Sequence, residues 1–277
     1  MRPLSLLFIL WPVLGACACR TTPDEAREEL AKLNVPYTSD EFVLRCGRGP
    51  TNVVALFLIA GGDPNVEVAL ERYVFTPLMA AAQGGRLDIA KQLVEAGARP
   101  DLRTSDGSSA LDIAAADCRA PEMVQFLLAK GARPTEQCLF LAVKHELFQQ
   151  SQCGLAGLEA LIGAGAKVDQ RRRTDHLTPL MLAADNNDLE AVRTLLRHGA
   201  NPNLRGGSYD FSPLRIAVMR AMNKGRPDQL EVVKALVAAG ADVNQSDRDG
   251  GTILSGLGPS PGLQPIREVL LRAGAHR

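Results

Sequence analysis

The side chains that could bind a metal or act as catalytic groups are few and widely spaced in this chain. No histidine has a second histidine or a cysteine pair at the spacing of a zinc site. The chain also lacks a phosphate-binding glycine loop that ends in Lys-Ser/Thr and a G-x-G-x-x-G dinucleotide motif. We therefore predict a non-enzymatic protein with no metal and no cofactor. The four histidines are His145, His176, His198 and His276.

Among the six cysteines, Cys17 has the most distinctive surroundings. Residues 4–14 (LSLLFILWPVL) form an apolar stretch after Arg2 that has the length of an export signal and is too short to span a bilayer. Residues 14–17, Leu-Gly-Ala-Cys, resemble a bacterial lipobox, in which a cysteine after small residues is lipidated and becomes the mature N-terminus. Because residue 18 is alanine and not aspartate, the resemblance implies an outer-membrane lipoprotein whose body faces the periplasm.

Two other interpretations of this segment remain open. Residues 16–18, Ala-Cys-Ala, also fit an ordinary signal peptidase site, and cleavage there would release a soluble periplasmic or secreted protein. The segment could instead be a buried N-terminal strand, which the polar TTPDEAREE that follows disfavours. On the lipobox interpretation, residues 1–16 are a signal peptide. Residues 17–37 are then a tether and a capping helix, which begins with the capping-box sequence Thr-Pro-Asp-Glu at residues 22–25.

A recurring glycine shows which elements must position any functional side chain. Each copy closes a short aliphatic run, and the intervals between copies are 36, 34, 34, 34, 41 and 34 residues. A fixed period near 34 residues is typical of a solenoid, in which each repeat buries its apolar face only against its neighbours. We expect each glycine to end a helix in the left-handed conformation. These glycines are Gly61, Gly97, Gly131, Gly165, Gly199, Gly240 and Gly274.

Each repeat begins with a phrase such as Thr-Pro-Leu at residues 76–78 and 178–180, where Thr can cap a helix and Pro suits its first turn. A short polar link, a second apolar-periodic helix and the glycine follow. These phrases, together with AGA-x-[PV]-[ND] around the glycines, resemble the ankyrin repeat over residues 38–277. The resemblance implies an all-α solenoid with short β-hairpin fingers. We count seven repeats, ending near residues 65, 101, 135, 169, 203, 244 and 277.

Some local features depart from this pattern. Two repeats have longer links between their helices, expected at residues 145–155 and 219–228. Glycine and proline in the seventh repeat predict a short or broken first helix. We interpret the glycine pairs at residues 84–85 and 206–207 as turn glycines.

Four cysteines lie within the repeats. The links of consecutive repeats lie side by side in this architecture, so a disulfide between Cys118 and Cys153 is possible in an oxidising compartment. Cys46 and Cys138 fall on first helices and are expected to be small buried side chains.

Composition argues against a nucleic-acid partner. The 31 basic and 31 acidic residues give zero net charge, and only 4% of residues are aromatic, so both a basic field and base-stacking platforms are scarce. We predict a monomer that binds a protein partner and contacts the membrane only through its lipid anchor.

The resemblance implies protein–protein recognition through the fingers and the concave helix surface. The cluster of three arginines at residues 171–173 could bind an acidic partner or a lipid headgroup, or could be merely a solvated turn. The residues expected to contact the partner are Arg103, Ser105, Asp106, Arg171, Arg173, Asp175, Tyr209, Asp210, Arg248 and Asp249.

The expected function is capture of a protein by a preformed surface held in the envelope by the lipid. Two alternatives share this fold. One is an immunity-type inhibitor of a specific envelope-acting toxin or enzyme, and the other is a structural scaffold of envelope components. An enzyme with an unrecognised site is a more distant alternative.

Overall fold

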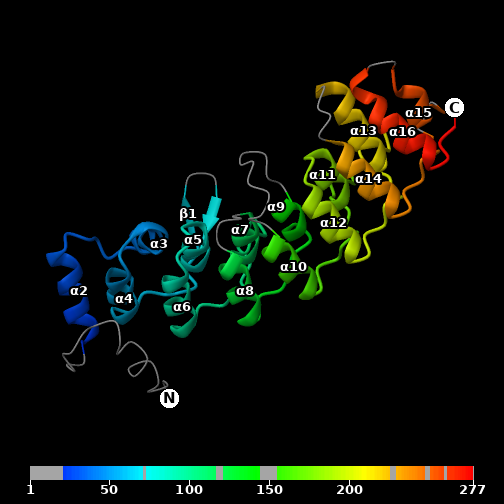
Figure 1. The fold of residues 1–277 in the computed structure, drawn as a ribbon. Coiled ribbons are helices and arrows are strands. Elements are labelled where there is room, and N and C mark those ends of the chain that lie inside the picture. Colours follow the sequence, from blue (N-terminus) through cyan, green and yellow to red (C-terminus); the bar gives the residue numbers. More distant parts are fainter. Residues whose placement is uncertain are drawn as a thin grey trace. The chain divides into compact units, whose positions relative to one another are not determined.

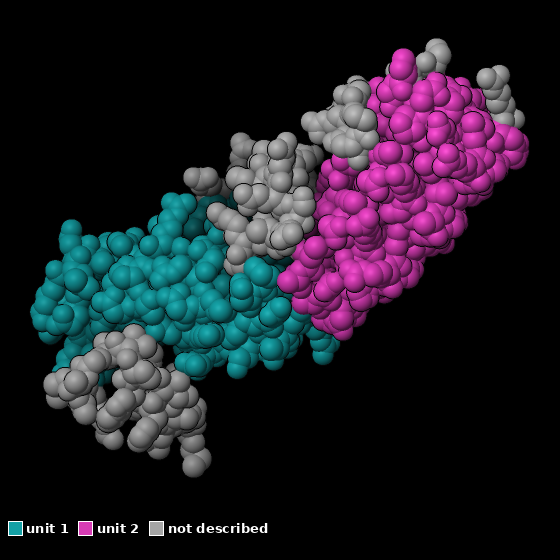
Figure 2. All heavy atoms as spheres, viewed as in Figure 1, with its two compact units in different colours: residues 1–133 teal, residues 134–277 magenta. Residues whose placement is uncertain are grey.

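The computed structural model describes residues 21–70, 73–116, 121–143, 155–224, 229–246, 250–258 and 261–276, without the side chains of residues 223 and 224. The chain forms two compact units, residues 1–133 and 134–277 (Figure 2). Each unit is a stack of helical hairpins in two rows, one made of the first helices of the repeats and one of the second helices (Figure 1).

In unit 1, the first helices α3, α5 and α7 pack in sequence, and the second helices α4 and α6 pack in a parallel row that α2 extends (Figure 1). A β-hairpin, β1 (Val68–Leu70) with β2 (Tyr73–Phe75), projects before α5, and its register pairs Val68 with Phe75. The helices are α2 (Pro23–Lys32), α3 (Ser39–Arg48), α4 (Thr51–Ile59), α5 (Pro77–Gln83), α6 (Leu87–Glu95), α7 (Ala110–Ala116) and α8 (Pro121–Ala129).

Helix α2 is capped at both ends and packs against α4 of the first repeat. The Thr22 hydroxyl accepts from the Glu25 amide, and the Glu25 carboxylate accepts from the Thr22 amide, which completes the expected capping box. The helix ends at Leu33, and Asn34 takes the left-handed conformation with φ of 55°. Ala26 and Leu30 are fully buried against α4, so the helix covers the end of the stack in unit 1.

In unit 2, the first helices α9, α11 and α13 pack in order, and the second helices α10, α12, α14 and α16 form the other row. The described first helix of the last repeat is only four residues long, as the glycines and prolines there predicted. The elements are α9 (Cys138–Val143), α10 (Leu155–Gly163), α11 (Pro179–Asp185), α12 (Leu189–Arg197), α13 (Pro213–Lys224), α14 (Leu230–Ala238), α15 (Ile253–Gly256), the 3-10 helix η2 (Pro261–Leu263) and α16 (Gln264–Arg272).

The recurring glycines end the second helices as expected. All seven have φ between 84° and 99°, a conformation that costs little only without a Cβ. The capping residues at the starts of first helices are also confirmed. Thr76 and Thr178 accept hydrogen bonds from the amides of Met79 and Met181, at 3.2 and 3.3 Å.

One expected link is wrong in part. The longer connection of the sixth repeat was expected to begin at residue 219, but α13 continues as a helix to Lys224. Ala221 is buried, so the added helical residues extend the packed face of α13. The other long link, residues 145–155, lies outside the described residues except for Leu155, which begins α10. Cys46 and Cys138 are both fully buried on first helices, as predicted.

Asparagine side chains connect the turns of consecutive repeats within each unit. Asn203 Nδ2 donates to the Gly240 carbonyl at 3.0 Å, and Asn203 Oδ1 accepts from the Asp242 amide at 2.7 Å. Asn65 and Asn244 each make the same pair of bonds, one to the carbonyl of the next recurring glycine and one from the amide two residues after it. At the equivalent position Asp169 accepts from the Asn201 amide, but a carboxylate has no hydrogen to donate to a carbonyl.

This difference predicts opposite effects for two exchanges at one structural position. Asp169→Asn gains a donor for the following turn and should raise the free energy of unfolding by about 0.5–1 kcal/mol. Asn203→Asp loses a donor and places a carboxylate beside a carbonyl oxygen, which should lower it by about 1 kcal/mol. Urea unfolding of both variants checks this, and a loss of stability in Asp169→Asn would contradict it.

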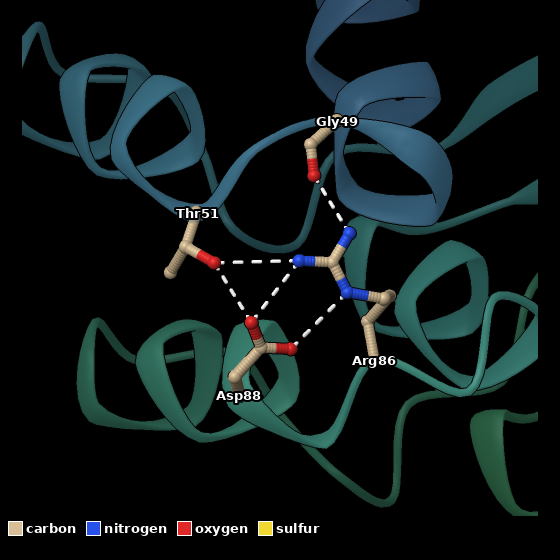
Figure 3. Close-up of polar contacts among 4 residues, drawn as sticks. All are labelled: Gly49, Thr51, Arg86 and Asp88. Carbon is tan, nitrogen blue, oxygen red and sulfur yellow. Dashed lines mark hydrogen bonds and ion pairs between the residues drawn. The ribbon is translucent and has the colours of Figure 1, made fainter.

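A second polar junction in unit 1 is built around Arg86, just before α6 (Figure 3). Its guanidinium donates to the Gly49 carbonyl at 2.7 Å and to the Thr51 hydroxyl at 3.3 Å, at the boundary of α3 and α4. It also donates to both carboxylate oxygens of Asp88, and Thr51 donates to Asp88 at 2.7 Å. The junction therefore joins the links of two consecutive repeats.

Asp88 gives this junction a dependence on pH. Partial burial disfavours its charge, but the hydrogen bonds from Arg86 and Thr51 outweigh burial and lower the pKa of Asp88 from 3.8 to about 2. A lowered pKa means that the ionised form stabilises the fold above pH 4, and that this contribution is lost as the pH falls toward 2. We expect Asp88→Asn to be less stable than the wild type at pH 6, with a difference that shrinks between pH 4 and pH 2. Chemical unfolding across this range measures it, and a constant difference would contradict the role of Asp88.

Candidate partner-binding surface

The predicted contact residues that the structure describes lie on the turns between repeats, which we call fingers. In unit 2 the first finger is residues 170–177 and the second is residues 204–211. The second finger closes as a short hairpin, in which Gly206 and Phe211 exchange two backbone hydrogen bonds of 3.0 and 2.8 Å. Asp210 reverses the chain there with φ of 57°.

The first finger is closed by an ion pair inside its own turn. Arg172 donates from Nε and Nη2 to the two carboxylate oxygens of Asp175, which also accepts from the Leu177 amide at 3.2 Å. These bonds lower the pKa of Asp175, and the bond from Arg172 contributes most. Burial has a smaller effect in the opposite direction. Asp175 therefore holds the turn in shape.

The two fingers are bonded to each other. The Gly207 amide donates to the Asp175 carbonyl at 2.8 Å, and the Arg171 guanidinium donates to the Arg205 carbonyl at 2.8 Å. Gly206 makes the close approach possible, because a Cβ at this residue would lie 2.4 Å from the His176 carbonyl oxygen. The two fingers thus form one body.

Three of the predicted contact residues project from this body. Tyr209 is 70% exposed, and its ring stacks on Phe211 with centroids 5.4 Å apart. The Arg173 side chain is 86% exposed and forms an ion pair with Glu136 at 3.1 Å. Arg171 is exposed, and among the described residues its guanidinium has no carboxylate partner. Asp210 differs from these, because Arg205 forms an ion pair with its carboxylate at 3.0 Å.

Unit 1 carries the other predicted group, on the turn between Arg103 and Ser109, which form an isolated β-bridge. Asp106 accepts from the Thr104 hydroxyl at 2.6 Å and from the Ser108 amide at 3.0 Å, and these bonds lower its pKa. The Ser105 amide donates to Glu67 at 3.2 Å. Arg103, Ser105 and Asp106 are all exposed, but Asp106 is engaged within its own turn.

The remaining predicted residues are Cys17, Cys118, Cys153, Arg248 and Asp249, and all five lie outside the described residues. Lipidation and the disulfide therefore stay predictions. Sequence reasoning missed Phe211, which supports the Tyr209 ring, and Arg215, whose guanidinium lies 5.1 Å from the Phe211 centroid. It also missed Tyr73 of the β-hairpin, which is 64% exposed. Two aromatic residues two positions apart, shortly after the Gly-Gly pair at residues 206–207, are the signal that could have identified the Tyr209–Phe211 stack.

The described parts of the chain offer little for catalysis. Within them, no group of three or more His, Cys, Asp or Glu side chains is placed to hold a metal ion. Residues 258–262 (G-P-S-P-G) have the letters of a G-x-S-x-G nucleophile motif, which requires a strand, a sharp turn and a helix. Here the short helix α15 precedes the motif and η2 begins within it, at Pro261, so the match gives no support for a hydrolase. None of the helices in the described residues has the length and apolarity needed to span a bilayer.

The repeat pattern and its geometry match a known family. The family model described as "Ankyrin repeats (3 copies)" matches residues 44–138 and 140–247, well over half of the chain. The chain belongs to the ankyrin-repeat family. Ankyrin repeats are protein–protein interaction modules, so the coarse prediction of a non-enzymatic interaction fold is supported.

Curated relatives share the ankyrin repeats over part of their length. Ankyrin repeat and SOCS box protein 6 of Mus musculus is 32% identical over 124 residues, which cover 44% of this chain and 28% of that protein. The B-cell lymphoma 3 protein homolog of Mus musculus is 30% identical over 197 residues, 69% of this chain and 40% of that protein. The chain spans about a third of the length of the curated relatives it matches first.

Solved structures confirm the predicted ankyrin solenoid. The ankyrin repeat domain of Bcl-3, described as a member of the IkappaB protein family, superposes with a TM-score of 0.64 at 25% identity, covering 83% of this chain and 97% of that domain. An ankyrin repeat domain from Acinetobacter baumannii AYE superposes with a TM-score of 0.59 at 25% identity, covering 72% of this chain and 98% of that domain. The human ASB11 ankyrin repeat domain, at 23% identity, covers 85% of this chain and 98% of that domain with a TM-score of 0.66.

Proposed function

We propose that this ankyrin-repeat chain captures a protein partner on its fingers while a lipid on Cys17 holds it at the bacterial envelope. The observation that carries the proposal is the rigid pair of fingers in unit 2. Two inter-finger hydrogen bonds fix it, and Arg171, Arg173 and Tyr209 project from it. A preformed surface loses little conformational entropy on binding, and arginine and tyrosine are the residue types that most often dominate binding energy.

The tether rests on the sequence at residues 14–17, which follows the apolar stretch directly. We propose an outer-membrane lipoprotein whose repeats face the periplasm. The similarity to an ankyrin repeat domain from Acinetobacter baumannii AYE supports a bacterial setting for the fold. A single acyl chain binds membranes only marginally, so stable anchoring needs the several chains that a lipobox cysteine receives.

Partner capture is tested by crosslinking the lipid-bearing protein in intact cells and purifying the complexes. The variant Arg171→Gln/Arg173→Gln/Tyr209→Ala should lose the partner. A matched control, Arg193→Gln/Lys234→Gln, removes two exposed charges from α12 and α14 and should retain it. One stoichiometric partner would favour the immunity-type inhibitor, and a diffuse set would favour the scaffold. Equal capture by the finger variant and the control would contradict binding at the fingers.

The tether has its own test. Metabolic labelling with a fatty-acid analogue should label the wild type and Cys19→Ser but not Cys17→Ser. Label on the Cys17→Ser protein would refute the lipobox assignment. Cell fractionation of the same strains should move Cys17→Ser out of the outer-membrane fraction.

A further inference from the structure

In the two unit 2 fingers, the carboxylates are bonded within the fingers, whereas other side chains can still bind a partner. Asp175 is held by Arg172 and by the Leu177 amide, and Asp210 is held by Arg205. Both carboxylates therefore stabilise their own turns. The side chains of the fingers that remain able to bind a partner are cationic and aromatic.

The available arginines differ in how they are engaged. Arg171 uses Nη1 for the Arg205 carbonyl, which fixes the guanidinium at the junction of the fingers and leaves most of its donors for a ligand. Among the described residues Arg173 forms an ion pair only with Glu136, and both side chains are more than half exposed. Exposed pairs of this kind are worth little, so a partner carboxylate can replace Glu136 at small cost. A planar guanidinium binds carboxylates in a bidentate manner.

Tyr209 adds a supported aromatic ring to the same pair of fingers. Its ring rests on Phe211, and the Arg215 guanidinium lies over Phe211 while donating to the Gly251 carbonyl at 2.8 Å. Phe211 thus supports the ring, and Tyr209 as a whole is 70% exposed. Exposed aromatic rings with fixed support are common anchors of protein interfaces.

We infer that the partner surface bound by the unit 2 fingers is an acidic protein segment, with carboxylates on Arg171 and Arg173 and an apolar side chain on Tyr209. This inference rests on the proposed function. An anionic membrane surface fits less well, because it attracts clusters of unpaired Lys and Arg. Here three arginines of the fingers form ion pairs with Glu136, Asp175 and Asp210. A protein segment can place its carboxylates selectively, whereas a lipid surface presents uniform negative charge.

The test uses three synthetic peptides of equal length with the same leucine and tryptophan positions and with Glu, Gln or Lys elsewhere. Fluorescence anisotropy of the labelled peptides with the full repeat protein gives their affinities. We expect the Glu peptide to bind about tenfold or more tighter than the Gln peptide and to weaken as salt is added. The Lys peptide should not bind. Vesicles of phosphatidylglycerol and phosphatidylcholine are the membrane probe. They are mixed with the Cys17→Ser protein, which has no lipid anchor, and should remain unbound.

Variants then locate the binding. Arg171→Gln/Arg173→Gln should weaken the Glu peptide about tenfold, and Tyr209→Ala should weaken the Glu and Gln peptides alike. Arg193→Gln/Lys234→Gln removes the same charge elsewhere in unit 2 and should change neither affinity. Circular dichroism confirms that each variant is folded before it is scored.

Several results would overturn the inference: no peptide bound by the wild type, equal affinity for the Glu and Gln peptides, full affinity in the double arginine variant, or binding to the vesicles. Its failure can be told apart from failure of the proposed function. If charge does not matter but the finger variant still loses its crosslinked partner, only the acidic segment is wrong. If the finger variant keeps the partner, capture at the fingers itself is wrong.

Discussion

Replacing Gly84 with alanine should lower the free energy of unfolding of unit 1 by roughly 1–3 kcal/mol. Gly84 ends α5 with an ordinary φ of −79°, so its backbone conformation does not require glycine. The reason is contact with the neighbouring repeat. A Cβ on Gly84 would lie 2.1 Å from the Gly47 carbonyl oxygen in α3 and 3.0 Å from its carbonyl carbon. Backbone atoms cannot rotate aside, so the whole helix pair must separate.

A matched control isolates this contact from the general effect of adding a methyl group. Gly163 lies in helix α10, and a Cβ there would meet nothing within 4 Å. Gly163→Ala should therefore be neutral or stabilise unit 2 by up to about 1 kcal/mol, because alanine favours the helix. Urea unfolding followed by circular dichroism compares the two variants. A Gly84→Ala protein as stable as the wild type would show that α3 and α5 do not approach as closely as described.

The period of the sequence predicted the architecture but not this contact. The recurring glycines and the Thr-Pro-Leu phrases gave the helix ends and starts, because both depend on local backbone chemistry that repeats every 34 residues. Gly84 was interpreted as a turn glycine. A side chain is excluded at Gly84 because a carbonyl of the preceding repeat lies against it. The residues near Gly84 in the sequence do not reveal which backbone atom of that repeat lies opposite.

The position of the fingers could also be predicted from local sequence, but the pairing of their side chains could not. Polar turn residues with glycine indicated projecting turns, and exposed arginines and Tyr209 are found there. The sequence could not show that Arg172 rather than its neighbours pairs with Asp175, because three adjacent arginines are equivalent in composition and differ only in side-chain direction. Nor could it separate carboxylates that shape a turn, such as Asp106, from those free to meet a partner.

Some hydrogen bonds between repeats join residues separated by one repeat period, a spacing that can be read from the sequence. The Arg171–Arg205 and Asn65–Arg99 bonds both join residues 34 positions apart. In a stacked array, equivalent positions of consecutive repeats lie side by side, so a pair separated by one period is a candidate contact. The Asp88–Thr51 bond joins residues 37 positions apart, in the part of the chain where the interval between recurring glycines is 36 residues.

Replacing Phe57 with alanine should have the largest effect on stability, a loss of about 3–5 kcal/mol. Phe57 lies on α4 and is 1% exposed, and its ring stacks with Tyr37 and Phe42 at centroid distances of 5.6 and 5.2 Å. Removing it leaves a cavity between the two remaining rings at the end of unit 1 that α2 covers. A terminal repeat has a neighbour on one side only, so this end should open before the rest of the array.

Tyr37→Phe is the matched control, since it keeps the ring stack and removes only the hydroxyl that donates to the Ala60 carbonyl at 3.0 Å. It should cost about 1 kcal/mol. Hydrogen exchange measured residue by residue distinguishes local from global loss. In Phe57→Ala the amides of α2, α3 and α4 should lose protection while those of α12 in unit 2 keep it. Uniform loss across both units would contradict a capped, separately opening end. Unchanged protection in α2 would show that the aromatic stack does not hold the cap.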